Sequence, residues 1–183
     1  MNYLRGFVPW IAFAVVSSAG WQWGASAALV IGGWLLVRDR QAGEEAGAKI
    51  LEISTVVFFA LLTAFAFARP DSGLQHWSGA LSLGWLGLTA WATLAAGRPF
   101  TTGIARKQAP SEVWHTPLFR RINVVITAFW AASFTLTAGA VTAISSAGFG
   151  STVSTLAQIA GFVVAAVFTA RYPARAAARS VHA

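Results

Sequence analysis

The chain contains no cysteine, and only 10% of its 183 residues are charged. Without thiols it has no disulfide, no thiolate nucleophile and no cysteine-ligated metal or haem. Water-soluble domains carry about 25% charged residues, far more than this chain does. Because 56% of its residues are hydrophobic, we expect an all-α, polytopic transmembrane helix bundle rather than a soluble domain.

Motifs that hold metals or phosphates are also missing. The sequence has no Gly-rich phosphate loop, no His-x-x-x-His pair and no acidic pair within an apolar segment. His76, His115 and His182 fall on both sides of the expected bilayer and cannot share a metal ion. We therefore expect no cofactor, no metal and no catalytic residues, and a non-enzymatic role.

Acidic residues are few as well, since 6 Asp and Glu stand against 13 Lys and Arg for a net charge of +7. In a soluble protein this excess would suggest a nucleic-acid partner. In a membrane protein it is the ordinary result of topology, because basic residues accumulate in cytoplasmic loops. Nucleic acid is therefore not an expected partner.

Six apolar segments are candidates for membrane spans: 7–19, 22–37, 50–68, 77–96, 117–144 and 152–170. About 20 apolar residues are needed to cross a hydrocarbon core of ~30 Å. The first segment is the shortest, so it either spans with a tilt or re-enters the same face. The short turns between segments predict three helical hairpins in one membrane domain, residues 1–183.

Basic residues are distributed unevenly among the connecting segments. Six spans would place the N-terminus, the 38–49 loop, the 97–121 segment and the 171–183 tail on one side. These carry 12 of the 13 basic residues, namely Arg5, Arg38, Arg40, Lys49, Arg98, Arg106, Lys107, Arg120, Arg121, Arg171, Arg175 and Arg179. Only Arg69 lies opposite, so the positive-inside rule predicts that both termini are cytoplasmic. If 7–19 does not span, the N-terminus lies outside.

The longest connecting segment, 97–121, has recognisable boundaries. Pro99 disfavours helical geometry at Arg98 and should end the fourth span there. Thr116 and Pro117 form an N-cap and first-turn proline, which predict the start of the fifth. This segment is expected to be the main cytoplasmic loop.

Within this loop, Pro110 should begin a short helical turn that bears Trp114. Such a turn with a Trp is expected to lie in the interface plane, near Arg106. Arg120 and Arg121 in the first turn of the fifth helix oppose its dipole, but anionic headgroups would compensate by ~1 kcal/mol each. The loop is therefore either a lipid-facing connector or a surface for partner docking or substrate gating.

The basic tail repeats arginine every four residues, at Arg171, Arg175 and Arg179. These share one face if the helix continues beyond Pro173. We expect this face to rest on anionic lipid headgroups.

Glu52 is the acidic residue in an apolar segment. A carboxylate in the first turn of the third helix is favoured by the dipole and can stay at headgroup level. The alternative is that it faces the interior, where it takes up a proton or pairs with Arg98 or Arg121.

Polar and aromatic residues recur on one face of the fifth helix at spacings of four and three. They are Asn123, Thr127, Trp130, Phe134 and Thr137. Such a face suits interhelical hydrogen bonds, and a packing seam is favoured over a substrate path. Gln158 in the sixth helix is expected to be a buried amide bonded to a neighbour.

Several short motifs occur in an order that resembles one known family. They are FVPWIAF followed by ASAALVI, then GRPF, PSEVW and FRRINVVITAFWAASF. This arrangement resembles the bacterial intracellular septation protein A family, with matched positions at Pro9, Arg98, Pro99, Pro110, Trp114, Asn123 and Trp130. Between Trp114 and Asn123 the chain carries HTPLFRRI, which is longer than in the family, and its third helix and tail match only in hydrophobicity.

The resemblance implies a multi-pass protein of the bacterial cytoplasmic membrane that supports septation or envelope integrity. It supplies no catalytic residues, so the matched positions are expected to be conformational or interaction sites. Partners would be division or envelope-synthesis proteins, with self-association into a homo-oligomer also open. One alternative is a small transporter or channel with a path between the helices, lined by Asn123, Thr127 and Gln158 and gated by Arg98 and Trp114. The other is an accessory subunit of a larger membrane complex.

Overall fold

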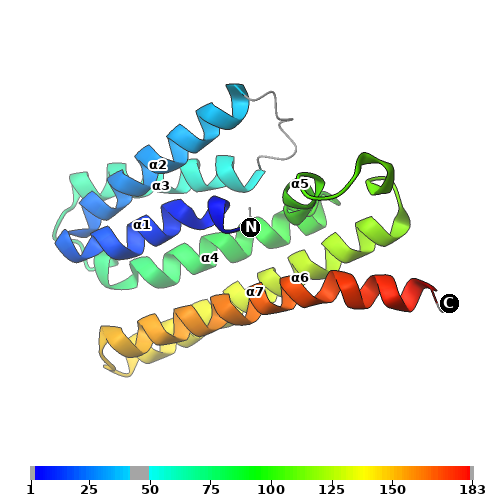
Figure 1. The fold of residues 1–183 in the computed structure, drawn as a ribbon. Coiled ribbons are helices and arrows are strands. Elements are labelled where there is room, and N and C mark those ends of the chain that lie inside the picture. Colours follow the sequence, from blue (N-terminus) through cyan, green and yellow to red (C-terminus); the bar gives the residue numbers. More distant parts are fainter. Residues whose placement is uncertain (1–2, 42–49, 182–183) are drawn as a thin grey trace. The chain divides into compact units, whose positions relative to one another are not determined.

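The structure, a computed structural model, describes residues 3–41 and 50–181. These residues form helices and short connections and contain no strand (Figure 1). The helices are α1 (Val8–Val16), α2 (Trp21–Gln41), α3 (Ile50–Ala68), α4 (Leu74–Ala95), α5 (Thr101–Arg106), α6 (Pro117–Ser146) and α7 (Ser151–Val181), with the 3-10 turns η1 (Tyr3–Phe7), η2 (Ser17–Ala19) and η4 (Ser111–Val113). The predicted all-α class is confirmed, and each of the six apolar segments coincides with a helix.

Three of these helices are long and apolar enough to cross a membrane. They are α3, α6 and residues Ser151–Ala178 of α7, with mean hydropathies of 2.2, 1.7 and 1.9 over their most apolar stretches. Among the described residues, α2 and α4 have sufficient length but are less apolar, and the Arg5–Ala19 stretch is shorter. The protein thus has the helices of a membrane protein, with three spans indicated by length and composition.

The chain divides into two compact units, Met1–Ser82 and Leu83–Ala183, and the boundary falls within α4. In the first unit, aromatic rings from α1 and α3 pack together. The Trp10 ring lies 5.1 Å from Phe58 and 4.7 Å from Phe59, and Phe13 lies 5.4 Å from Phe59. Trp10 is therefore a core residue of this unit.

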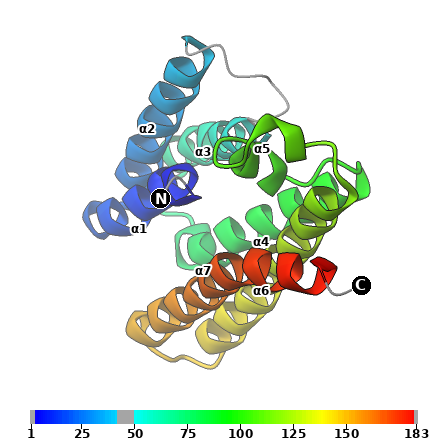
Figure 2. The same cartoon turned by 45° about the vertical axis from the view of Figure 1, so that its right-hand side comes forward.

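In the second unit, α6 and α7 lie antiparallel and side by side (Figures 1 and 2). Gly148, with a φ of 76°, ends α6 and lets the chain reverse, in the turn expected at 145–151. The Ser133 hydroxyl donates to the carbonyl of Gly161 at 2.8 Å, which requires a close approach of the two helices. This confirms the predicted pairing of these two helices.

Tryptophan–threonine hydrogen bonds join helices at three places in the described chain. In each, the indole N–H donates to a threonine hydroxyl on another helix, and that hydroxyl donates to the carbonyl four residues earlier. The pairs are Trp10–Thr55 at 3.1 Å, Trp91–Thr135 at 3.1 Å and Trp130–Thr169 at 2.8 Å. Such bonds satisfy the indole N–H and fix the contact between the two helices.

The end of α4 differs from the prediction. The helix ends at Ala95, and Gly97 follows in the left-handed region with a φ of 67°. The Arg98 amide bonds to the Thr93 carbonyl and the Gly97 amide to the Leu94 carbonyl, both at 2.9 Å, which forms a Schellman motif. Gly97 therefore ends the helix before Pro99 can do so.

Candidate functional site

The basic residues of the second unit gather at one end of the α6–α7 hairpin. Residues 122–170 contain no charged residue, so all charge in this hairpin lies at its open end. The antiparallel pairing of Phe129 with Phe168 places Arg120 and Arg121 at the same end as Arg171 and Arg175. All four arginines are exposed there, and Arg120 and Arg121 occupy the first turn of α6 as predicted.

The helix α5 is fixed to α6 at this end by buried polar contacts. Thr101, 1% exposed, donates to the Asn123 carbonyl at 3.1 Å and shares a 2.8 Å hydrogen bond with the Thr127 hydroxyl. The Asn123 amide donates to the Phe119 carbonyl at 2.9 Å. The predicted face of α6 is buried as a set, and Asn123 and Thr127 form a packing contact with α5.

The rest of the connection between α4 and α6 folds back on itself. Trp114 follows the one-turn helix η4, and its indole N–H donates to the Ala109 carbonyl at 3.0 Å. The Arg106 guanidinium lies 5.4 Å from the Trp114 ring centroid, within the range of a cation–π contact. The predicted helical turn bearing Trp114 is confirmed. The side chains of Arg106 and Trp114 contact each other inside the 97–121 segment.

The residues at the two boundaries of this segment contact α5 and α6. Thr116 caps α6 by accepting from the Phe119 amide at 3.2 Å, as predicted. Pro99 is buried beside α5, whereas Arg98 and Pro110 are exposed. The 97–121 segment is thus a folded element with one side on α6 and the other in contact with solvent.

An ion pair that the sequence did not predict joins η1, just before α1, to the C-terminal end of α2 in the first unit. Arg5 donates to the Asp39 carboxylate at 2.7 Å, and the Asp39 side chain is only 7% exposed. At the opposite end of α2, the Trp21 indole donates to the Pro70 carbonyl at 3.0 Å, next to Arg69. The acidic residue between Arg38 and Arg40 was the available signal, because one carboxylate among cations tends to be paired.

Two further predictions concern Glu52 and Gln158. Glu52 lies in the first turn of α3 and is half-buried. Gln158 was expected to be a buried amide bonded to a neighbour; it is half-buried, and its amide donates to the Ser154 carbonyl one turn earlier on α7 at 3.3 Å. The Gln158 side-chain amide is thus hydrogen-bonded within α7.

The tail is helical beyond Pro173, since α7 continues to Val181. Arg171, Arg175 and Arg179 therefore lie four residues apart on one helix, as predicted. The Arg179 side chain and the whole of Lys49 and His182 lie outside the described residues.

Comparisons with protein-family models, with curated proteins and with solved structures found no match to this chain. In the described ranges, no group of three or more His, Asp and Glu side chains is arranged to hold a metal ion. The site is therefore described by its own geometry, as the basic end of the α6–α7 hairpin, where the folded 97–121 segment packs on α6.

Proposed function

We propose that this protein is a non-enzymatic membrane protein that docks a partner protein through the 97–121 segment. The observation that carries the proposal is the fixed position of α5, held by the Thr101 hydrogen bonds to Asn123 and Thr127. A simple connector between two spans does not need a buried polar anchor of this kind. A preorganised surface loses less conformational entropy on binding than a flexible loop does.

The proposed topology has six spans and both termini in the cytoplasm. The location of 12 of the 13 basic residues in four alternate connecting segments supports it through the positive-inside rule. Within each unit, segments that this topology puts on the same side also lie together. In the first unit Arg5 pairs with Asp39, and in the second Arg120 lies at the same end of the hairpin as Arg171. In this topology α1 would cross the membrane together with the 3-10 turns η1 and η2 on either side of it.

The exposed side of the 97–121 segment has a mixed chemical character that suits a protein partner. Its exposed side chains include Lys107, Gln108, Ser111, Glu112, Val113 and His115, together with Arg98, Pro110, Pro117, Arg120 and Arg121 at its boundaries. A lipid-facing surface would be expected to be uniformly basic or apolar, whereas this one includes a carboxylate. Basic residues next to it, such as Arg120, would rest on anionic headgroups.

The resemblance to the septation protein A family is the support for a bacterial cytoplasmic membrane and for a role in septation or envelope integrity. The proposed partners are therefore proteins of cell division or envelope synthesis. This part of the proposal depends on the order of the sequence motifs around Pro99, Trp114 and Asn123.

Photocrosslinking in living bacterial cells tests the docking proposal. A photoreactive amino acid at Glu112 or His115, both exposed, should capture defined division or envelope-synthesis proteins. The matched control position is Phe149, which is 60% exposed in the turn at the other end of the α6–α7 hairpin. Capture should be lost on Thr101→Val and kept on Thr102→Val. If Glu112 and His115 capture only lipid, the segment is a membrane connector and the docking proposal fails.

A further inference from the structure

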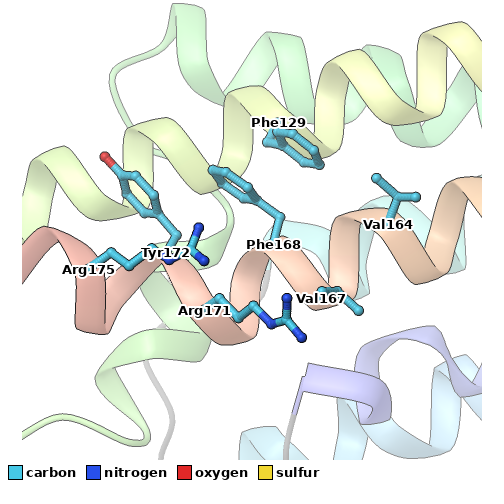
Figure 3. A pocket seen from close by; sticks show the side chains of 7 residues that line it. All are labelled: Phe129, Val164, Val167, Phe168, Arg171, Tyr172 and Arg175. Carbon is cyan, nitrogen blue, oxygen red and sulfur yellow. The ribbon is translucent and has the colours of Figure 1, made fainter.

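A groove runs along the α6–α7 hairpin close to its basic end (Figure 3). Its volume is about 250 Å³, and it is lined by Phe129 of α6 and by one stripe of α7 from Val164 to Arg175. Pockets for whole drug-sized molecules are typically about 300–1,000 Å³. The groove is thus suited to part of a long, thin ligand such as one acyl chain.

Stacked aromatic rings form the inner wall of this groove. The Phe129 and Phe168 rings are 4.0 Å apart and 6° from parallel, and Tyr172 stacks on Phe168 at 5.1 Å and 17°. On the outer side, Val164 and Val167 are 56% and 43% exposed. The groove therefore combines a rigid apolar wall with an open side through which a lipid can enter from the bilayer.

The lining changes from apolar to cationic along the helix. Arg171 is the first charged residue after the charge-free run that ends at Ala170, and Arg175 follows one turn later on the same face. Val164 and Arg171 are seven residues apart, or about 10 Å along the axis. Figure 3 shows both arginine side chains running back along α7 toward its N-terminal half, as side chains on a helix do. Their charged groups thus approach the apolar lining.

We propose that this groove is a binding site for one anionic phospholipid. The phosphate lies between Arg171 and Arg175, because guanidinium groups form paired hydrogen bonds with phosphate oxygens. One acyl chain follows the rings of Phe129 and Phe168 toward Val164. This is a discrete site, distinct from the general attraction of a basic surface to anionic lipid.

Native mass spectrometry of the purified full-length protein, with phosphatidylglycerol and phosphatidylcholine added in turn, tests this. Phosphatidylglycerol should bind in preference to phosphatidylcholine. The double variant Arg171→Gln/Arg175→Gln should weaken phosphatidylglycerol binding by about tenfold or more. Arg120→Gln/Arg121→Gln removes the same charge at the same end but outside the groove lining, and should leave binding within about twofold of the parent.

The acyl-chain part of the site has its own test. Val164→Trp would fill the apolar end of the groove without changing charge, and should weaken phosphatidylglycerol binding. Ile159→Trp places the same ring on an exposed position of α7 outside the groove lining, as the control. Soluble glycerol phosphate should not displace the lipid, because it lacks the chain.

Three results would overturn the proposal. The first is equal loss of lipid in the two double-arginine variants, which would mean diffuse surface attraction. The second is unchanged binding in Val164→Trp, and the third is displacement by glycerol phosphate. Far-UV circular dichroism of each variant checks that the helices are retained. Since lipid is measured on the purified chain, the outcome does not depend on partner docking through the 97–121 segment.

Discussion

Replacing Gly161 with alanine tests whether the close approach of α6 and α7 stabilises the second unit. A Cβ added at Gly161 would lie 3.1 Å from the Cβ of Thr137 and 3.2 Å from its Cγ2, and it would overlap the hydroxyl oxygen. Rotation of the Thr137 side chain cannot relieve this contact, because its Cβ is fixed to the backbone. The helices would have to separate by several tenths of an ångström, which would also strain the hydrogen bond from Ser133 to Gly161.

The expected magnitude follows from two opposing effects. Overpacking of a tight contact costs about 1–3 kcal/mol. Alanine is better than glycine inside a helix by about 0.5–1 kcal/mol, which partly offsets that cost. Gly161→Ala should therefore lower the free energy of unfolding by about 1–2 kcal/mol. Gly139→Ala, in α6 with no atom within 4 Å of the added Cβ, should instead raise it by about 0.5–1 kcal/mol.

The assay is SDS-induced unfolding of the purified protein in mixed micelles, followed by far-UV circular dichroism. The difference between Gly161→Ala and Gly139→Ala isolates the packing cost, since both gain the same helix propensity. Adding Thr137→Ala to Gly161→Ala removes two of the three close atoms and should recover part of the loss. If the two glycine variants change stability by the same amount, the tight α6–α7 contact is refuted.

Three further predictions concern hydrogen bonds and the ion pair. Trp130→Phe and Thr169→Val should couple by about 0.6–1.7 kcal/mol in a double-mutant cycle of unfolding, because each removes one end of the same bond. Arg5→Gln should lower the free energy of unfolding by about 0.5–1 kcal/mol at low salt, because the Asp39 carboxylate is left buried without this partner. The loss should be smaller at high salt, because salt screens the partly exposed Arg5 side chain. Thr101→Val should increase amide hydrogen exchange in residues 101–106 several-fold, since α5 loses its anchor on α6.

Each of these has a control elsewhere in the described chain. Pairing Trp130→Phe with Thr142→Val, an exposed threonine bonded within its own helix, should give no coupling. Arg40→Gln removes an exposed charge at the same helix end and should change stability less than Arg5→Gln does. Thr102→Val should leave exchange in α5 near the parent rate. Equal effects in control and test variants would contradict the corresponding contact.

Much of the helical layout was predictable because local signals define it. The apolar segment 117–144 and the Thr116-Pro117 cap correctly predicted α6, and the spacing from Asn123 to Thr137 identified its buried face. The end of α4 was placed at Pro99 because proline restricts the preceding residue, but the Schellman motif at Gly97 acts earlier in the chain. A glycine shortly after an apolar run carried the missing information.

The sequence by itself determined the helical class and the apolar character of the segments long enough to cross a membrane, because composition and hydrophobic period act locally along the chain. It did not reveal that Thr101 anchors α5, that Asp39 pairs with Arg5, or that Arg171 and Arg175 border an aromatic groove. Those contacts join residues distant in sequence, and a polar or charged residue alone does not specify its partner. Only the packing of one helix on another decided which donor meets which acceptor.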